Sequence, residues 1–464
     1  MKKCFIIIFS LFSLVSTAQD HFAGINTSKR VGILNVTLNP AELSNLSHKR
    51  EINFLAFSVN ASNNVLRVMD IYSNRKNLEE LLISTDHVNA NVGITTLGPS
   101  FAIRIGKWGF GVSTNVEAQL NLVNLNSNFA NVAFHNNDLV SSITINTGKN
   151  QRITTTAWGE VGFSVSRVLF EDIYQTFSVG GTLKLIIPTE YTNISMDQMN
   201  ATLALLDGDV QLTEASMNIN ITHSGGFANT GTRFINFNDL NYSKVNGLGG
   251  DIGATYILKK EDDEINYKLK GGMSIKNMGS MLFESKSNNA ISQNLYFSVP
   301  DLSFFDFRNS FNNAKTIYDI LTVLENSGFA SDSNPSNRFR VNLPTGLSLY
   351  TDYEIVNKVN ITIYGFKGLN SNYKTNNIVT QDLISLTPRF STHLGSSCDC
   401  TITPPKPNFN FEVYSPWSLN KVSGLVGGIG LRLGGFFIGS SSAITAFLGR
   451  GKEVDFNFGF RTGF

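Results

Sequence analysis

Charged residues are scarce in this 464-residue sequence, and so are apolar runs with the length of a membrane helix. Charged side chains make up 16% of the chain, against about 25% in typical soluble proteins. The net charge is +1, so there is no global field to attract nucleic acid. The absence of long apolar runs still allows entry into lipid as strands, because barrel strands are short and have only one apolar face.

Cysteine is nearly absent as well. Only Cys398 and Cys400 lie beyond residues 1–18, and they form a Cys-Asp-Cys pair within the Ser- and Pro-rich segment 396–407. Two such ligands without a further Cys or His nearby make a poor zinc site. We interpret the pair as an exposed loop feature, with a strained local disulfide as one form of it. The sequence predicts no metal site and no cofactor.

Signatures of an enzyme are lacking too. The segment 439–443 has the sequence Gly-Ser-Ser-Ser-Ala and lacks the second glycine of a nucleophile elbow. No His-Glu-x-x-His motif and no phosphate-binding loop occurs. We therefore expect a protein that is not an enzyme, although an outer-membrane hydrolase that assembles Ser, His and Asn in space remains a remoter alternative. The scattered histidines, interpreted as surface or loop residues, are His21, His48, His87, His135, His223 and His393.

The first eighteen residues have the pattern of a secretory signal peptide. Lys2 and Lys3 precede an apolar stretch over residues 4–15, and Ser16-Thr17-Ala18 supplies the small residues of a cleavage site. The stretch is shorter than the roughly 20 apolar residues of a spanning helix. We expect export and cleavage after Ala18.

Alternation with a period of two is the main structural signal. Near the C-terminus, Val454, Phe456, Phe458 and Phe460 fall on one parity and polar residues or glycine on the other. This places the two sets on opposite faces of a strand. The pattern fits a barrel with an apolar face toward lipid and a polar face toward a lumen. A soluble sandwich with a buried Phe face would give the same alternation.

Similar runs joined by short turns recur along the chain and predict β-hairpins. We predict an all-β fold, a single-chain antiparallel transmembrane β-barrel of about fourteen strands, with twelve or sixteen as alternatives. Closure is expected because an unpaired sheet edge cannot face lipid. The runs span 51–59, 89–96, 101–106, 108–116, 157–168, 176–186, 252–258, 265–271, 294–299, 339–353, 359–366, 382–389, 409–416, 425–433, 436–448 and 453–464.

Three stretches interrupt this pattern. Residues 69–85 contain a short amphipathic helical pattern over 77–83, residues near 189–247 form a long insertion rich in Asn and Thr, and residues near 314–326 place apolar side chains at helical spacing. We expect each to be an external loop or a segment folded into the lumen.

A short motif, Asn39-Pro40-Ala41-Glu42, precedes the first clear strand. It predicts a helix start, with Asn39 as the cap, Pro40 at the first helical position and Glu42 returning a bond as in a capping box. The motif also resembles the N-terminal hatch of the long-chain fatty-acid channel (FadL-type) superfamily. That resemblance implies a fourteen-stranded barrel over 51–464, plugged from inside by a hatch over residues 19–50.

A second resemblance covers nearly the whole chain after the signal peptide. The sequence is similar to a Bacteroidota outer-membrane family, the domain of unknown function DUF5723. In addition, Phe464 resembles the terminal aromatic residue of the outer-membrane assembly signal, with Phe458 and Phe460 on the same alternating face. The segments that carry the family resemblance are 23–26, 30–34, 412–417 and 428–439, and 271–279 and 343–348 resemble barrel segments of the FadL-type group.

These resemblances imply a location in the outer membrane of a Gram-negative bacterium. The first functional hypothesis is a plugged channel for hydrophobic small molecules. The alternative is a barrel that serves as a docking or structural component of the envelope or of a type IX-like secretion system. The partners expected are outer-membrane lipid, the barrel-assembly machinery during insertion, and a hydrophobic ligand or a secretion-system protein. Nucleic acid is not expected.

Overall fold

The computed structural model describes residues 21–29, 32–73, 85–128, 142–206, 209–224, 244–260, 263–285, 290–314, 316–332, 335–394 and 409–464. The predicted signal peptide, the Cys398–Cys400 pair and the helical pattern at 77–83 lie outside these residues. No helix in the described part of the chain is long and apolar enough to cross a membrane.

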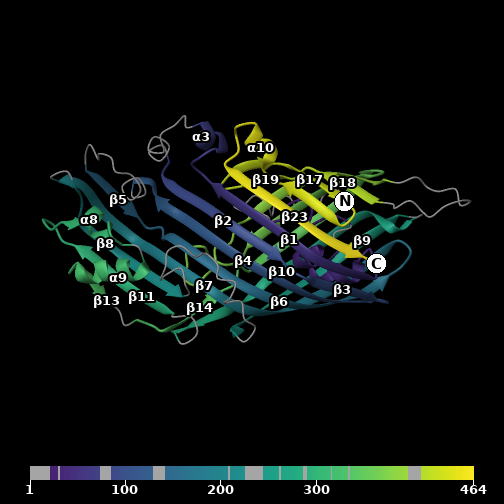
Figure 1. The fold of residues 1–464 in the computed structure, drawn as a ribbon, viewed down its shortest axis with the longest axis horizontal. Helices are drawn as coiled ribbons and strands as arrows, with labels where there is room; N and C mark the ends of the chain where they lie inside the picture. Colours follow the sequence, from purple (N-terminus) through teal and green to yellow (C-terminus); the bar gives the residue numbers. More distant parts are fainter. Residues whose placement is uncertain are drawn as a thin grey trace, which may run out of the picture.

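The strands form a closed antiparallel barrel with 14 positions around the ring, as predicted (Figure 1). The first and last strands close it, with a register that runs from Glu51↔Gly463 to Ser62↔Glu453. In ring order the strands are β1 (Arg50–Asn63), β2 with β3 (His87–Leu97, Ser100–Ile105), β4 (Trp108–Asn126), β6 (Gln151–Glu171), β7 (Gln175–Leu206), β9 (Gly247–Lys260), β10 (Asp263–Glu284), β14 with β15 (Arg338–Asn342, Gly346–Val356), β16 (Val359–Gly368), β17 (Leu383–Leu394), β18 with β19 (Phe409–Tyr414, Trp417–Asn420), β20 with β21 (Gly424–Gly427, Ile429–Leu433), β22 (Phe436–Ser440) and β23 (Glu453–Gly463).

The two ends of the ring differ in their connections. At one end, which we call the turn end, tight turns at residues 106–107, 172–174, 357–358 and 434–435 join neighbouring strands. At the other end, which we call the loop end, the connections are longer, as at 64–86, 369–382 and 441–452. The first of these carries the short helix α3 (Val68–Ser73), and the last carries α10 (Ala443–Phe447).

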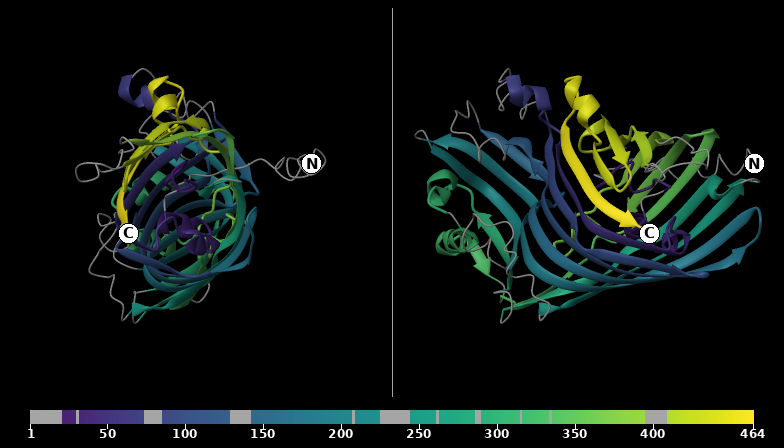
Figure 2. Two further views of the ribbon diagram at one scale, coloured as in Figure 1. Left: turned by 90° about the vertical axis from the view of Figure 1, so that its right-hand side faces the viewer. Right: turned by 45° about the vertical axis from the view of Figure 1, so that its right-hand side comes forward.

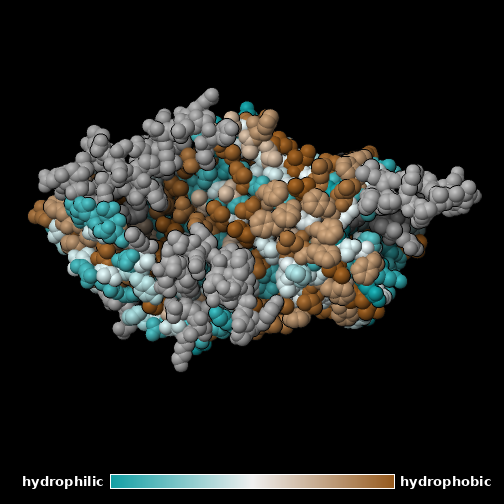
Figure 3. Space-filling model, viewed as in Figure 1, coloured by the Kyte–Doolittle hydropathy of each residue, from teal (hydrophilic) through white to brown (hydrophobic). Residues whose placement is uncertain are grey.

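Large apolar side chains are exposed on the outside of the ring. Along β23 the even-numbered residues Val454, Phe456 and Phe460 are exposed, whereas Glu453 and Asp455 on the other parity are buried. Figure 3 shows apolar residues gathered over the middle of the ring wall. This arrangement inverts that of a soluble sandwich and removes that alternative, because the Phe face points away from the interior. Further exposed members of this surface are Phe101, Trp108, Phe110, Phe163, Leu183, Ile252, Met273, Ile363, Phe390 and Phe436.

Several strand positions consist of two strands in line, separated by a break. Three of the breaks contain a proline, namely Pro99, Pro344 and Pro416. Proline has no N–H to give to the ladder and can interrupt pairing, although Pro388 lies within the continuous strand β17. For this reason the single strand predicted over 339–353 is two strands, β14 and β15.

One predicted strand, 436–448, is wrong in its second half. Strand β22 ends at Ser440, and the helix α10 follows. The backbone N–H groups of Ser441 and Ser442 donate to the Asp455 carboxylate, both at 2.8 Å. This carboxylate turns the chain away from the wall, a contact between distant residues that alternation does not reveal.

Beyond the loop end, part of the sheet continues as an extension. Here the C-terminal half of β7 pairs with β8, and β8 with β11, so residues near 189–224, expected as part of an insertion, lie largely in strands. A core of Met199, Leu203, Phe297, Phe305 and Leu321 packs between this sheet and its helices. The elements of the extension besides β7 are β5 (Ile143–Thr147), β8 (Asp209–Ser224), β11 (Ile291–Val299), β12 (Phe305–Asp306), β13 (Ala330–Asp332), α8 (Phe307–Phe311) and α9 (Ile317–Asn326).

Candidate functional site: the occupied lumen

The N-terminal residues 21–29 and 32–46, which we call the lumen segment, lie inside the ring (Figure 2). They form α2 (Ile33–Leu38) and the 3-10 helix η1 (Pro40–Asn45). Their polar contacts reach β9, β10, β15, β17, β18 and β21, and also β1 across the ring from β15. An exterior position could not give contacts with strands on opposite sides of a barrel, so the segment occupies the lumen.

Asn39 acts as the cap of η1. Its Oδ1 accepts a hydrogen bond from the Ala41 N–H at 3.0 Å, and Pro40 follows as the first residue of the helix. Its Nδ2 donates to the wall, to the Ala254 carbonyl at 2.9 Å and Thr255 Oγ1 at 3.2 Å. One side chain thus begins the helix and attaches it to β9.

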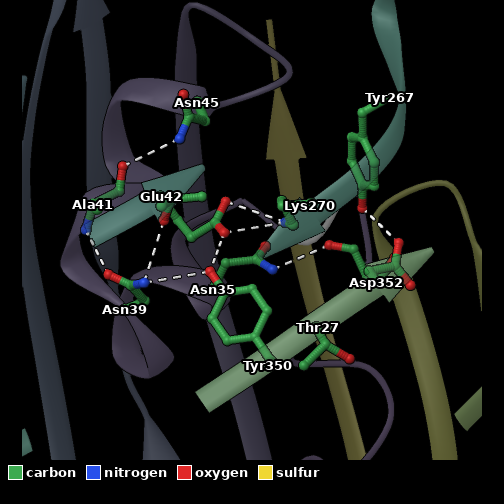
Figure 4. A network of polar contacts seen from close by, with 12 residues as sticks. Thr27, Asn35, Asn39, Ala41, Glu42, Asn45, Tyr267, Lys270, Tyr350 and Asp352 are labelled. Atoms are coloured by element: carbon green, nitrogen blue, oxygen red, sulfur yellow. Dashed lines mark hydrogen bonds and ion pairs between the residues drawn. The ribbon is translucent and has the colours of Figure 1, made fainter. Parts of the chain in front are cut away.

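Glu42 does not close a capping box. The Asn39 N–H, which that motif would use, donates to the Asn35 carbonyl at 2.8 Å. The Glu42 carboxylate instead faces the wall, where Lys270 Nζ lies 3.2 Å away and the Tyr350 hydroxyl donates to it (Figure 4). Glu42 and Lys270 are both buried. The local sequence pattern could not disclose this, because both partners come from strands more than two hundred residues away.

Two glycines let η1 approach the wall closely. A Cβ at Gly180 would lie 2.6 Å from the carbonyl carbon of Pro40, and a Cβ at Gly109 would lie 2.4 Å from the carbonyl oxygen of Leu43. Both distances are too short for any side chain, so these strand positions suit only glycine while the lumen segment is in place.

A second anchor is built around Arg389 on β17. Its Nη2 donates to the Gly24 carbonyl at 2.7 Å and to Thr27 Oγ1 at 3.1 Å, both in the lumen segment. Within the wall, its guanidinium lies 3.2 Å from Asp352 and 2.9 Å from Glu412. Arg389 therefore links the lumen segment to carboxylates of β15 and β18.

Hydrogen-bond donors surround Asp352, whereas Oε1 of Glu412 accepts no hydrogen bond among the described residues and meets Arg389 only as an ion pair. Asp352 also accepts hydrogen bonds from the Tyr267 hydroxyl at 2.7 Å, Asn360 at 3.0 Å and Thr362 at 2.6 Å. Glu412 accepts from Ser28 Oγ of the lumen segment at 2.8 Å. The donors around Asp352 offset part of the cost of burying its charge.

A third anchor lies where the ring closes. Glu51 on β1 accepts hydrogen bonds from Arg461 on β23 at 3.0 Å and from the Ile33 N–H of the lumen segment at 3.2 Å. All three side chains are buried. The same carboxylate therefore joins the first and last strands and holds the start of α2.

The loop end has an inward closure of its own. Residues 369–382 leave the ring at β16 and return at β17, yet they contact β6 and β7, which lie across the ring from those strands. Arg152 donates to the Asn377 carbonyl at 3.1 Å, and Asn150 to the Tyr373 carbonyl at 2.7 Å. This segment, which we call the crossing loop, therefore spans the ring.

Between the lumen segment and the crossing loop lies a cavity of about 190 Å³. Its lining includes Phe22 and Leu38 of the lumen segment and Val379 of the crossing loop. His21, near Ser58 Oγ at 3.0 Å, also lines it. Burial lowers the pKa of His21 to about 4, against a smaller opposing effect of Asp455, so this imidazole is neutral near pH 7.

The residues predicted as an assembly signal lie on or just beyond β23. Phe460 is exposed and stacks on Phe54 with ring centroids 5.4 Å apart, and Phe458 packs beside Phe57 at 5.7 Å. Phe464 is exposed and pairs through its backbone with Arg50. These aromatic residues thus lie along the seam that closes the ring.

The described residues give no metal site, since they contain no group of three or more His, Cys, Asp or Glu side chains that could hold an ion. The anchoring residues Lys270, Asp352, Arg389 and Glu412 were not singled out from the sequence. The signal that could have found them is a charged residue on the polar parity of a strand otherwise typical of a barrel.

Comparison with known proteins agrees with the family predicted from the sequence. The model of a family of unknown function, DUF5723, matches residues 40–441. No curated protein matches the chain. The toluene transporter TbuX of Ralstonia pickettii is similar in structure, with 10% sequence identity, 95% of this chain and 96% of that chain covered, and a TM-score of 0.37. The toluene transporter TodX of Pseudomonas putida has 9% identity, with 96% of this chain and 93% of that chain covered and a TM-score of 0.35. A Pseudomonas aeruginosa FadL homologue has 8% identity, with 96% of this chain and 98% of that chain covered and a TM-score of 0.33.

Proposed function

The chain belongs to the family of unknown function DUF5723, and we propose that it is an outer-membrane β-barrel whose lumen segment plugs a channel for hydrophobic small molecules. The observation that carries this proposal is the kind of contact that holds the segment. Asn39, Glu42, Ser28 and the backbone of Gly24 attach it to the wall through hydrogen bonds and ion pairs. Water can replace these polar contacts when the segment moves, whereas its apolar packing against the wall, as at Ile25 and Leu43, opposes release.

The outer surface supports a membrane location. Side chains such as Phe110, Phe163 and Phe390 are exposed on the ring wall. Each large apolar side chain moved from water into lipid gains about 1.5–3 kcal/mol. In bacterial barrels short turns face the periplasm and longer loops the exterior, so we place the turn end of this ring in the periplasm.

Two closures lie along the proposed path. The lumen segment is attached near the turn end, where Leu43 meets Gly109 on β4, and the crossing loop is attached by Arg152 at the other end of the cavity. A molecule that passes through must therefore displace both. We assign gating to the lumen segment, because it is held by anchors from several separate strands. The crossing loop, in contrast, is joined to the wall strands β16 and β17 at both of its ends.

The test is removal of the plug. A variant that lacks residues 21–46 should make liposomes measurably more permeable to small solutes than the full mature chain does. The variant must still change its gel mobility on boiling, which shows that its ring is closed. A closed ring with unchanged permeability would contradict the gating role.

A docking role for the barrel is the second candidate, and the extension is the observation that favours it. This sheet continues past the loop end and carries a core of its own, with Leu302, Phe304 and Tyr296 exposed. We would then expect a protein of the envelope or of a secretion system to bind it. Purification in mild detergent distinguishes the two roles, because a stable stoichiometric partner favours docking and a solitary barrel favours the channel.

A further inference from the structure

One face of the extension is a polar grid of side chains beyond the loop end (Figure 1). Strands β7, β8, β11 and β13 pair in that order, and their registers place residues from successive strands in rows across the sheet. Residues paired in this way lie on the same face. Two neighbouring rows, in strand order, are Asp197, Asn218, Tyr296 and Ser331, and Ser195, Asn220 and Asn294. Apart from the ring of Tyr296, these side chains are polar.

This face borders a cleft of about 460 Å³. Both rows line the cleft, together with Asn150 and with Thr375 of the crossing loop. Tyr191 lies on the same face of β7 as Asp197, and its hydroxyl donates to the Thr375 carbonyl. The polar face therefore continues the lumen side of the wall, and the cleft lies between this face and the crossing loop. Small-molecule sites commonly have volumes of about 300–1,000 Å³, so the size of the cleft suits a small ligand.

The amides of this face hold one another in position. Asn193 Nδ2 donates to Asn220 Oδ1 at 2.9 Å, and Asn220 Nδ2 donates to Asn294 Oδ1 at 2.8 Å. Asn218 Nδ2 donates at 3.3 Å to Oε1 of Gln198, which lies in a bulge of β7. Asn218 and Asn294 are exposed. A ligand in the cleft can therefore reach amides whose positions are already set, which reduces the entropy lost on binding.

Tyr296 supplies an aromatic ring in the middle of these polar groups. Its side chain is 50% exposed, and its neighbours in the row are Asn218 and Ser331. Neighbouring strands lie about 4.8 Å apart, so both polar side chains flank the ring closely. A sugar ring has an apolar C–H face and an edge of hydroxyl groups that donate and accept hydrogen bonds. The aromatic ring matches the first, and amides, which also donate and accept, match the second.

The same surface suits charged and peptide ligands poorly. The described residues that line the cleft include one carboxylate, Asp197, and no cationic side chain. A phosphate or carboxylate group would therefore lack the charged partner that usually binds it. A peptide strand would need an open sheet edge, but beside Tyr296 strand β11 pairs with β8 on one side and β13 on the other. A neutral ligand rich in hydroxyl groups remains the best match.

We propose that this cleft binds a small, neutral saccharide, at a site separate from the cavity beside the lumen segment. One sugar ring stacks on Tyr296, and its hydroxyl groups form hydrogen bonds with Asp197, Asn218 and Asn294. An apolar cavity of about 150 Å³ holds the six carbons of benzene, so 460 Å³ holds about 18 non-hydrogen atoms, which is most of a disaccharide. The site requires neither passage through the ring nor a protein partner, so its failure would leave both candidate functions standing.

The experiment is saturation-transfer NMR on the full mature chain in an amine-oxide detergent, because maltoside and glucoside detergents would themselves supply sugar rings. The probes are maltose, cellobiose, lactose and N,N′-diacetylchitobiose. At least one should bind with a dissociation constant of about 1 mM or below, and the C–H protons of one ring face should receive the strongest saturation. Sorbitol, which has as many non-hydrogen atoms as glucose but no ring, should not bind measurably. Absence of binding for all four disaccharides would overturn the inference.

Variants locate the site. Tyr296→Ala should weaken binding of the disaccharide roughly tenfold, as expected for loss of a ring contact, whereas Tyr296→Phe should keep most of the affinity. Asn218→Leu should weaken binding by a similar factor. Tyr353→Ala removes an exposed tyrosine of β15 outside the cleft, and it should leave the affinity unchanged. Affinity that survives both Tyr296→Ala and Asn218→Leu would contradict the assigned site. Limited proteolysis first checks that the extension of each variant is folded.

Discussion

Arg389 illustrates how a single residue holds the lumen segment in place. Its guanidinium joins two carboxylates of the wall to Gly24 and Thr27 of the lumen segment, and it is 1% exposed. Replacing two buried partners by apolar groups can be nearly neutral, but removing one leaves an uncompensated buried charge. The network is therefore sensitive to single substitutions.

We predict that Arg389→Met lowers the free energy of unfolding by about 3–5 kcal/mol, because Asp352 loses its buried cation and Glu412 keeps only Arg432, 3.4 Å away. Urea unfolding of the barrel in lipid vesicles measures this change. The matched control is Arg338→Met, whose ion pair with Glu284 is largely exposed and should contribute less than about 1 kcal/mol. Similar losses for the two variants would contradict the anchoring role.

A second residue-scale prediction concerns pH. The pKa of His21 is about 4 in the docked lumen segment because of burial, against 6.5 in a solvated chain. Between these values the released segment binds a proton that the docked segment does not, so docking is fully stable above about pH 6.5 and weakens as the pH falls toward 4.

At pH 5 the loss is on the order of 2 kcal/mol, so amide protection factors in the lumen segment, which allow for the slower intrinsic exchange at low pH, should be correspondingly smaller than at pH 7. In His21→Gln this particular loss of protection should disappear. An unchanged pH response in that variant would show that His21 is not the group responsible.

At the scale of elements, the extension is a sheet with its own core, which the polar composition of residues near 189–247 does not reveal. Its sheet carries Asn193, Asn220 and Asn294 on one face and Ile219, Ile221 and Phe297 on the other. The apolar face packs against α9, whose start is closed by a capping box between Thr316 and Asp319. Strands form here because helices cover the apolar face, even though Asn is poorly suited to strands.

We predict that Phe297→Ala destabilises the extension by about 3–5 kcal/mol, since it leaves a cavity among Phe305 and Phe329. Limited proteolysis should then cut within the extension, while the gel mobility shift of the ring on boiling persists. Tyr296→Ala, on the exposed face of the same strand, is the control and should change cleavage little. Loss of the mobility shift in Phe297→Ala would contradict an independent core.

The element scale also explains the errors in strand bounds. Alternation predicts which residues can pair in a strand, but the position where a strand ends also depends on contacts with the neighbouring strand. Pro344 divides β14 from β15 by removing a donor, which the sequence does disclose. The end of β22 at Ser440 depends on Asp455, a residue of the next strand, and no local pattern contains that contact.

At the scale of the whole molecule, the seam between β1 and β23 determines whether the chain can enter lipid. Each backbone group left unpaired in hydrocarbon costs several kcal/mol, so the ring must be complete. Phe54 and Phe460 stack across this seam on its lipid-facing side, and Glu51 and Arg461 pair across it on the inside. The seam is therefore stabilised on both faces, by an aromatic pair outside and an ion pair inside.

We predict that the mature chain extracted in detergent migrates faster on a gel before boiling than after it, as a compact closed barrel does. A variant that lacks residues 453–464 should show one mobility under both conditions, because β1 and β22 are left as open edges. A retained shift in the truncated chain would mean that the ring closes without β23.

The sequence by itself determined the ring. Period-two alternation with short turns specifies strands that are apolar on one face, and the cost of unpaired backbone in lipid requires that they close. It also determined the start of η1, because Asn39 and Pro40 act on the backbone directly beside them. The start of η1 depends on neighbours in the chain, and the closed ring depends on the lipid that all strands face.

Only the tertiary structure decided what fills the ring. The partners of Glu42 and the cluster around Arg389 come from strands hundreds of residues apart, and they meet because closure places opposite strands across one lumen. The same closure encloses the cavity between the lumen segment and the crossing loop. Their positions depend on ring order and register, which no local pattern of residues contains.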